Sequence, residues 1–295
     1  MDNLAETALA RLLPRVRAIA PELCIQTTLY NGDGLANELV IVNNAVAFRF
    51  ARHDWGRAAL RNELIVLDRI RGHMPIRVPE PFHRSDDSMA YPLLAGRALS
   101  PQALHAMQVA ERERVAAQIG AFLEALHRTV LLDDMPRTSA PVTHVVWLER
   151  YQRIRNTLYP LMLPHQVAWA ETLFGPVLAS NGFFEYTPAL IHGDIAPYHL
   201  LSDPESATLI GVIDFGVAGV GDPASDLGAV LQVYGSRFVE ALLVAYPQAR
   251  ALLPRARFYA QAIELEWVMN GLEQGQPFWF TAHLGAARDL EQWHA

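Results

Sequence analysis

The sequence predicts an α+β protein of two lobes, with a β-rich N-terminal lobe in residues 1–94 and a mainly helical C-terminal lobe in residues 95–295. Short apolar runs of strand type, separated by glycine and asparagine turns, are concentrated before residue 95. Longer patterns with apolar residues three or four positions apart dominate after it. The length of 295 residues, 51% of them hydrophobic, also suits two packed lobes better than one.

The N-terminal lobe is expected to start with a helix and to continue as a sheet. Apolar residues at helical spacing predict helices over residues 3–20 and 57–71. Runs of β type predict five strands, over residues 24–29, 38–42, 45–50, 78–82 and 90–94. A hinge to the second lobe is expected near residues 93–97.

The C-terminal lobe is expected to be helical with two short strands inserted. Amphipathic patterns predict helices over residues 109–128, 144–162, 165–180, 225–246 and 254–274. The strands are expected at residues 189–191 and 209–214. Acidic motifs stand at the ends of both strands, so their carboxylates are candidates for a shared site.

The charge distribution limits the classes of function. The chain has no lysine, so all 24 basic residues are arginines, and a phosphate contact must use arginine, histidine or backbone. Residues 1–189 hold 19 acidic and 19 basic residues, whereas residues 190–295 hold 12 and 5, which places the net charge of −7 in the C-terminal third. No nucleic-acid partner is expected, because it would need clustered basic surface. The acidic excess fits either a cationic ligand or an ordinary solvated surface.

Cysteine usage and the N-terminal residues bear on location. Cys24 is the one cysteine, which excludes an intrachain disulfide and a thiolate zinc cage and suits a reducing compartment. The N-terminus lacks a basic start with a continuous apolar run, and no stretch reaches 18 apolar residues. We therefore expect a cytoplasmic monomer without a membrane partner.

Two aspartates, twenty residues apart, give the strongest functional signal. Asp194 follows the apolar run at residues 189–191, and Asp214 follows the run at residues 209–213. Phosphoryl transfer needs a group that orients the attacking hydroxyl and accepts its proton, and hard oxygen ligands for Mg²⁺ on the nucleotide phosphates. Two neighbouring carboxylates can divide these tasks.

The segment His192-Gly193-Asp194 resembles the catalytic loop of the aminoglycoside phosphotransferase family, which has a protein-kinase-like fold, and the likeness covers nearly the whole chain. It implies that Asp194 is the catalytic aspartate and that His192 is a structural anchor of the loop. His199 stands where the family usually has a metal-binding asparagine. Histidine at this position resembles the aminoglycoside 2″-phosphotransferases and the macrolide phosphotransferases, and it can bind Mg²⁺.

The same resemblance extends to the segment after the second strand. The motif Asp214-Phe215-Gly216 is similar to the metal-binding motif of the family and implies that Asp214 is the main Mg²⁺ ligand. A downstream Gly-Asp-Pro pattern ends at Asp226. By this likeness Asp226 is the N-cap of a helix and braces the catalytic loop.

The N-terminal lobe resembles the nucleotide site of the family. Arg49 stands where the family has a phosphate-binding lysine or arginine, and Glu63 matches the glutamate that pairs with it. The resemblance also implies a nucleotide-covering loop and a hinge that meets the purine, with the residues Gly32, Gly34, Asn37, Tyr91, Leu93 and Leu94. The implied donor is ATP or GTP with Mg²⁺. His127 is expected to be a buried, hydrogen-bonded core residue.

The acceptor is less clear from the sequence. In such families variable helices build the acceptor pocket, here about residues 141–185 and 236–295. Glu266, Asn270 and Glu273 share one helical stripe, and with Glu264 they can bind the ammonium groups of an aminoglycoside; the alternative is a solvated helix face. We therefore predict a kinase that phosphorylates, and so inactivates, an aminoglycoside-type antibiotic.

Three other functions stay open. They are a macrolide 2′-phosphotransferase, an amino-sugar or metabolite kinase, and a nucleotide-binding pseudokinase without activity. The joint presence of Asp194, Asp214, Arg49 and Glu63 weighs against the pseudokinase. A protein substrate is disfavoured, because the short segment between Asp214 and Asp226 leaves no room for a long activation segment.

Overall fold

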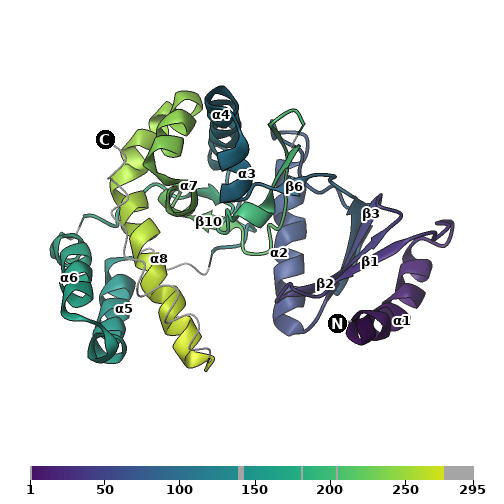
Figure 1. Cartoon of the computed structure of the whole chain (residues 1–295), viewed down its shortest axis with the longest axis horizontal. Helices are drawn as coiled ribbons and strands as arrows, with labels where there is room; N and C mark the ends of the chain where they lie inside the picture. Colours follow the sequence, from purple (N-terminus) through teal and green to yellow (C-terminus); the bar gives the residue numbers. More distant parts are fainter. Residues whose placement is uncertain (1, 139–142, 181, 204, 276–295) are drawn as a thin grey trace.

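The computed structural model describes residues 2–138, 143–180, 182–203 and 205–275. Figure 1 shows a smaller N-terminal lobe, with its sheet and two flanking helices, beside a larger lobe made mostly of helices. This arrangement confirms the predicted α+β class.

The N-terminal lobe is an antiparallel five-stranded sheet with the strand order β1-β2-β3-β5-β4. Its elements are α1 (Asp2–Ile19), β1 (Thr28–Asn31), β2 (Asn37–Val42), β3 (Val46–Ala51), α2 (Asp54–Ile70), β4 (His83–Arg84) and β5 (Ser88–Pro92). The first strand starts later than predicted, because the side chain of Asn43 accepts the N–H groups of Gln26 and Thr27. The strand predicted at residues 78–82 is absent, since Pro79 and Pro81 cannot donate to a ladder.

The two faces of this sheet are covered by different helices. Phe48 and Phe50 of β3 pack with Leu12 and Val16 of α1 in one buried cluster. A second cluster joins Leu60 of α2 to the opposite face of the sheet. Because side chains alternate along a strand, Arg49 lies on the α2 face, which is the face that meets the second lobe.

In the described part of the C-terminal lobe, all five predicted helices and both predicted strands are present. Several short elements are present that the sequence did not predict. Its strands are β6 (Arg97–Ala98), β7 (Ala189–Ile191), β8 (Leu200–Asp203), β9 (Thr208–Val212) and β10 (Gly219–Gly221). Its helices are α3 (Pro101–Ala106), α4 (Val109–His127), α5 (His144–Thr157), α6 (Pro164–Ala179), α7 (Ala224–Ala245) and α8 (Leu253–Glu273). The unpredicted elements β6, β8, β10 and α3 are too short to give a periodic signal.

Two small sheets hold the loops that follow β7 and β9. Strand β7 pairs antiparallel with β10, and the second sheet has the order β6-β8-β9. A backbone hydrogen bond of 2.9 Å from Val212 to the carbonyl of Arg77 ties β9 to the segment that leads out of α2. We propose the lobe boundary between residues 94 and 95, because β5 ends at Pro92 and β6 already belongs to the second lobe.

Helix α7 lies at the centre of the larger lobe, between α4 and α8 (Figure 1). Among the described helices it alone is long and apolar enough to cross a membrane by length and composition, but 44% of that stretch is buried. Its contacts identify it as a core helix. At Gly235 the backbone leaves the helical region, with φ 80° and ψ 174°, so α7 is kinked there.

Candidate active site

The loop after β7 carries Asp194, and hydrogen bonds to the side chain of Asp226 hold this loop in place. The Oδ2 and Oδ1 atoms of Asp226 accept the N–H groups of His192 and Gly193, both at 2.8 Å. His127, which is buried as predicted, lies 3.1 Å from the same carboxylate and 3.2 Å from the hydroxyl of Tyr246. Burial would raise the pKa of Asp226, but these hydrogen bonds outweigh it and lower the pKa.

Asp226 therefore braces the loop, but the prediction that it is an N-cap is wrong. Helix α7 begins at Ala224, so Asp226 lies inside its first turn. Asp222 serves the first turn instead, because its Oδ1 accepts the N–H of Ala224 at 3.0 Å. Asp222 is fully buried and also pairs with Arg255 at 2.7 Å, a role that the sequence did not reveal.

His192 connects the two aspartate segments. Its Nε2 donates to the carbonyl of Ile213 at 3.1 Å, directly before Asp214, and its Nδ1 accepts the N–H of Asp194 at 3.3 Å. Burial lowers the pKa of His192, which favours the neutral ring that this pattern requires. Gly193 beside it has a φ of 78°, and a Cβ there would lie 3.0 Å from the carbonyl oxygen of Val217. The turn thus needs glycine.

Asp214 and His199 face each other across the site and fit a magnesium ion. Nδ1 of His199 donates to the carbonyl of Asp194 at 2.8 Å, which leaves Nε2 directed at Oδ2 of Asp214, 3.4 Å away. Neighbouring ligands of an octahedral Mg²⁺ lie about 3 Å apart, so both atoms can bind one ion. Within the described residues no group of three or more metal-ligating side chains occurs. The other ligands would be phosphate oxygens and water, as is usual for Mg²⁺.

The electrostatics of this pair follow from their contact. Burial opposes protonation of His199, but Asp214 and Asp194 outweigh it and raise the pKa of the ring. Burial also acts to raise the pKa of Asp214, yet His199 and Arg49 hold it well below its usual range. Asp214 has a φ of 66°, a strained conformation that points to a functional constraint.

The ion pair expected between Arg49 and Glu63 is present. One guanidinium nitrogen of Arg49 donates to both carboxylate oxygens of Glu63 at 2.8 Å, and the other donates to Asp214 at 3.2 Å. Glu63 is fully buried, which raises its pKa to about 7 against the opposing charge of Arg49. Its Oε1 also accepts the N–H of Phe215 at 3.3 Å, so α2 is joined to the Asp214 segment.

A cavity of about 630 Å³ lies between the lobes, next to the ion pairs of Arg49. Of the residues predicted to bind nucleotide, Gly34, Asn37, Arg49 and Tyr91 line it, together with Asp194, His199 and Asp214. Gly32 lies beside the cavity, where its carbonyl accepts a hydrogen bond from Arg52. Tyr91 contributes its side chain from β5, and burial raises the pKa of its phenol to about 12.

The structure places the predicted hinge residues Leu93 and Leu94 outside the wall of this cavity, since neither is among the described lining residues. The N–H of Leu93 donates to the carbonyl of Ala45 at 2.7 Å, so this amide is not available to a purine. Leu94 is buried and its side chain packs towards Gly211.

A second cavity, of about 290 Å³, opens on the other side of Asp194. Its walls come from the loop of residues 193–198 and from α5, α7 and α8, and they include Trp147, Tyr198, Tyr259 and Trp267. The charged side chains in the wall are Asp194, Arg150 and Glu266. Two cavities that meet at one carboxylate suit a reaction between two bound molecules.

Comparison with known proteins agrees with this geometry. The profile of the phosphotransferase enzyme family, APH, matches residues 30–259. The chain belongs to this family. A viomycin phosphotransferase from Streptomyces vinaceus is 27% identical over 200 residues, which cover 64% of this chain and 65% of that protein, just under two thirds of its length.

Solved structures of similar fold cover almost the whole of this chain. The GDP and kanamycin complex of APH(2″)-IIIa has a TM-score of 0.80 at 21% identity and covers 93% of this chain and 96% of that one. A macrolide 2′-phosphotransferase from Brachybacterium faecium has a TM-score of 0.69 at 20% identity, with 95% and 97% covered. These likenesses confirm the predicted protein-kinase-like fold.

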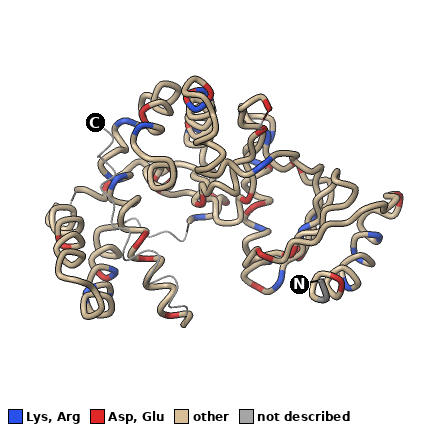
Figure 2. Tube along the Cα trace, in the orientation of Figure 1, with Lys and Arg blue, Asp and Glu red and all other residues tan. Residues whose placement is uncertain are grey.

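The residues on α8 that were predicted to bind the acceptor do not form one surface. Glu266 lines the second cavity, whereas Glu264 is buried and neither it nor Asn270 or Glu273 is among the described lining residues. The stripe is also not a free anionic face, because Glu266 pairs with Arg150 at 2.8 Å and Glu273 pairs with Arg153. Figure 2 shows acidic positions along α8 and basic ones on the neighbouring α5. Residues 276–295 of the predicted acceptor segment 236–295 lie outside the described residues.

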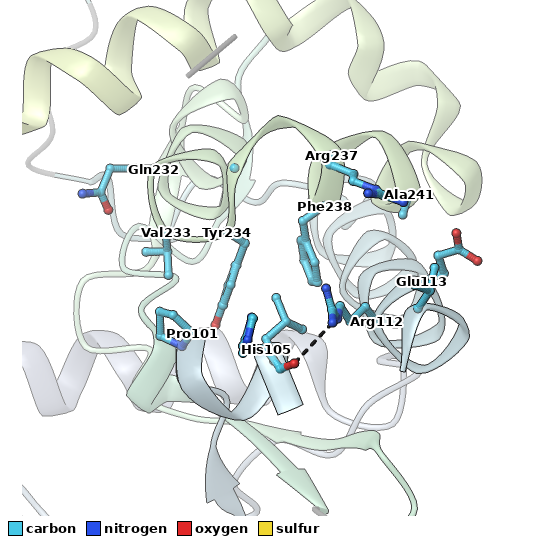
Figure 3. A pocket seen from close by; sticks show the side chains of 13 residues that line it. Pro101, His105, Arg112, Glu113, Gln232, Val233, Tyr234, Arg237, Phe238 and Ala241 are labelled. Atoms are coloured by element: carbon cyan, nitrogen blue, oxygen red, sulfur yellow. Dashed lines mark hydrogen bonds between the residues drawn. The ribbon is translucent and has the colours of Figure 1, made fainter. Parts of the chain in front are cut away.

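A third cavity of about 360 Å³ lies away from Asp194, between α3, the start of α4 and the kink of α7 (Figure 3). Tyr234 and Phe238 enter it from α7, and Arg112 lies opposite them, donating to the carbonyl of His105 at 3.2 Å. Gln232 and Val233 line both this cavity and the second cavity. The two cavities therefore share the stretch of α7 just before the kink at Gly235.

Proposed function

We propose that this phosphotransferase transfers the γ-phosphate of ATP or GTP to a hydroxyl group of an aminoglycoside-type antibiotic. The observation that carries the proposal is the position of Asp194, whose half-exposed carboxylate lines both cavities. A hydroxyl bound in the smaller cavity then faces a phosphate bound in the larger one. The viomycin phosphotransferase and the structure with kanamycin and GDP support an antibiotic acceptor and a nucleotide donor.

The residues divide the reaction between them. Asp194 orients the acceptor hydroxyl and accepts its proton. Arg49, fixed by Glu63, binds phosphate oxygens, while the loop that contains Gly34 and Asn37 covers the phosphates. Asp214 and His199 would hold Mg²⁺, which neutralises charge on the phosphates when bound. Asp226 and His192 keep the loop in place.

A macrolide is the second candidate acceptor. The second cavity, here called the acceptor cavity, is walled mainly by aromatic and aliphatic side chains. Among its described lining residues the one acid besides Asp194 is Glu266, which is already paired with Arg150. Such a wall suits a large ring with an apolar face as well as it suits a polyamine. We further propose that the protein acts as a monomer in the cytoplasm, with no nucleic-acid or membrane partner.

A panel assay tests the proposal. Consumption of ATP and of GTP is measured with aminoglycosides, macrolides and simple amino sugars, for the wild type and for Asp194→Ala. We expect turnover with an aminoglycoside and a loss of roughly a thousandfold or more in Asp194→Ala. Asp86→Ala removes an exposed carboxylate between β4 and β5 and is the matched control. An unchanged rate in Asp194→Ala would refute its role, and turnover of macrolides alone would refute the aminoglycoside.

A further inference from the structure

The nucleotide and acceptor cavities share two of their described lining residues, Asp194 and Tyr198. A phosphoryl group that leaves one cavity for a molecule in the other must pass this junction. The carboxylate of Asp194 accepts hydrogen bonds when it is ionised, and it can only repel phosphate oxygens. The side chain at the junction that can donate a hydrogen bond is therefore the phenol of Tyr198.

The backbone places Tyr198 in the same short loop as Asp194 and His199. Residues Pro197–His199 form a single 3₁₀ turn that starts with proline, and the ring of Tyr198 stands edge-on to the ring of His199, with centroids 4.5 Å apart. His199 is itself held by the carbonyl of Asp194 at 2.8 Å. One short loop thus positions the proton acceptor, the metal-facing imidazole and the phenol together.

Tyr198 is nevertheless left exposed, unlike the buried aromatic residues in the wall of the acceptor cavity. Its relative exposure is 63%, whereas Trp147 and Tyr259 in the wall of the acceptor cavity are less than a tenth exposed. An ordinary phenol keeps its proton at neutral pH, so the hydroxyl of Tyr198 can donate a hydrogen bond.

In the described nucleotide cavity the arginine lies on the Asp214 side, so a neutral hydrogen-bond donor is useful on the Asp194 side. Arg49 is the arginine that lines the described nucleotide cavity, and it is bound to Glu63 and Asp214, on the Asp214 side of the site. The chain has no lysine that could reach from the Asp194 side. A phosphoryl group in transfer spreads its negative charge over three oxygens, and a donor is useful wherever one of them points.

We propose that the hydroxyl of Tyr198 donates a hydrogen bond to the phosphoryl group while it is transferred. In this step the bond between the γ-phosphorus and the bridging oxygen breaks, and its electron pair stays on the nucleoside diphosphate. The acceptor oxygen forms the new bond to phosphorus, and its proton moves to Asp194. Tyr198 keeps its own proton throughout. The inference rests on the proposed function of the same site.

The test compares Tyr198→Phe with Tyr198→Ala in steady-state kinetics. Phenylalanine keeps the ring but removes the hydroxyl, so we expect kcat to fall roughly 10- to 100-fold while both KM values stay within about twofold. Alanine removes the ring as well and should also raise the acceptor KM. Tyr159→Phe, which removes a phenol outside both cavities, is the matched control. A wild-type kcat in Tyr198→Phe would overturn the proposal.

A binding measurement gives a second result that does not depend on turnover. Aluminium fluoride with the nucleoside diphosphate imitates the planar phosphoryl group, and we expect Tyr198→Phe to weaken this complex while binding of the diphosphate alone is unchanged. Equal affinity of both proteins for the fluoride complex would contradict the proposal. If no antibiotic is phosphorylated, the acceptor proposal fails separately, and the Tyr198 variants are then compared by nucleotide hydrolysis with water as acceptor.

Discussion

The nucleotide cavity and the acceptor cavity meet at Asp194, but they are built in different ways. On the nucleotide side, buried charges hold one another in fixed positions, as Arg49 is bound by Glu63 and Asp214 at the same time. On the acceptor side, aromatic and aliphatic walls surround a partly exposed ion pair between Arg150 and Glu266. If the proposed roles hold, the phosphates meet a buried and fixed charge network, whereas the acceptor meets an apolar wall and a partly exposed ion pair that can exchange partners.

The largest expected effect comes from breaking the charge network at Arg49. Arg49→Ala leaves the fully buried Glu63 without its cation, so we expect the free energy of unfolding to fall by about 3–5 kcal/mol. We also expect kcat/KM for nucleotide to fall by roughly a hundredfold or more, because the phosphates lose their arginine. Denaturant unfolding and nucleotide-dependent kinetics measure the two effects.

A double variant separates stability from binding. Arg49→Met with Glu63→Leu removes both charges and should recover most of the lost stability without recovering nucleotide affinity. Recovery of both would show that Arg49 supports the fold rather than the phosphates.

A smaller effect is expected from the brace under the catalytic loop. Asp226→Asn weakens the acceptors for the two loop N–H groups, so we expect a loss of about 1–3 kcal/mol in unfolding free energy and of roughly tenfold in kcat. The folded-state pKa of Asp226 is lowered, so its stabilisation is complete above its ordinary pKa of about 3.9 and is lost as the pH falls through the folded value.

The pH dependence gives the check. The difference in unfolding free energy between wild type and Asp226→Asn should be constant from neutral pH down to about pH 5 and should shrink below about pH 4. If this difference in unfolding free energy instead increased as the pH falls, the ionised form of the carboxylate would not be the stabilised one.

The smallest effect is expected from a substitution in the acceptor cavity. Glu266→Gln should raise the KM of an amine-bearing acceptor by up to roughly tenfold and leave the KM for nucleotide unchanged, since Glu266 lines only the acceptor cavity among those described. Glu273→Gln, in the last turn of the same helix, is the matched control. Equal effects of the two substitutions would indicate that the overall charge of α8, and no particular carboxylate, attracts the acceptor.

The same contrast explains what the sequence could predict. Asp194 and Asp214 could be predicted to lie close together because each follows a strand, whereas Arg49 and Glu63 were predicted from the resemblance to the family. The structure brings Arg49 into contact with both Glu63 and Asp214. The stripe on α8 was predicted from one helix alone, yet the partner of Glu266 is Arg150, 116 residues away on α5. Periodicity cannot tell which helix covers which face, so Glu264 was assigned to the acceptor although it is buried.

Two other residues were missed for different physical reasons. Asp222 and Asp226 stand four positions apart at the start of α7, and only the observed first turn shows that the former serves the helix and the latter the loop. Tyr198 belongs to no periodic pattern, because it lies in a single 3₁₀ turn. Its exposure at the junction of two cavities became visible only when the lobes were placed together.

The arginine at position 49 has a consequence for chemical profiling. Acyl-phosphate derivatives of nucleotides label kinases by acylating the amine of a lysine beside the phosphates, and a guanidinium that stays protonated is not nucleophilic enough to react. This chain has no lysine, and the side chain of Arg49 is only 9% exposed, so dicarbonyl reagents directed at arginine would also reach it poorly. We expect a survey of nucleotide-binding enzymes based on such labels to miss this protein, so its proposed activity has to be tested by nucleotide binding or by turnover of an acceptor.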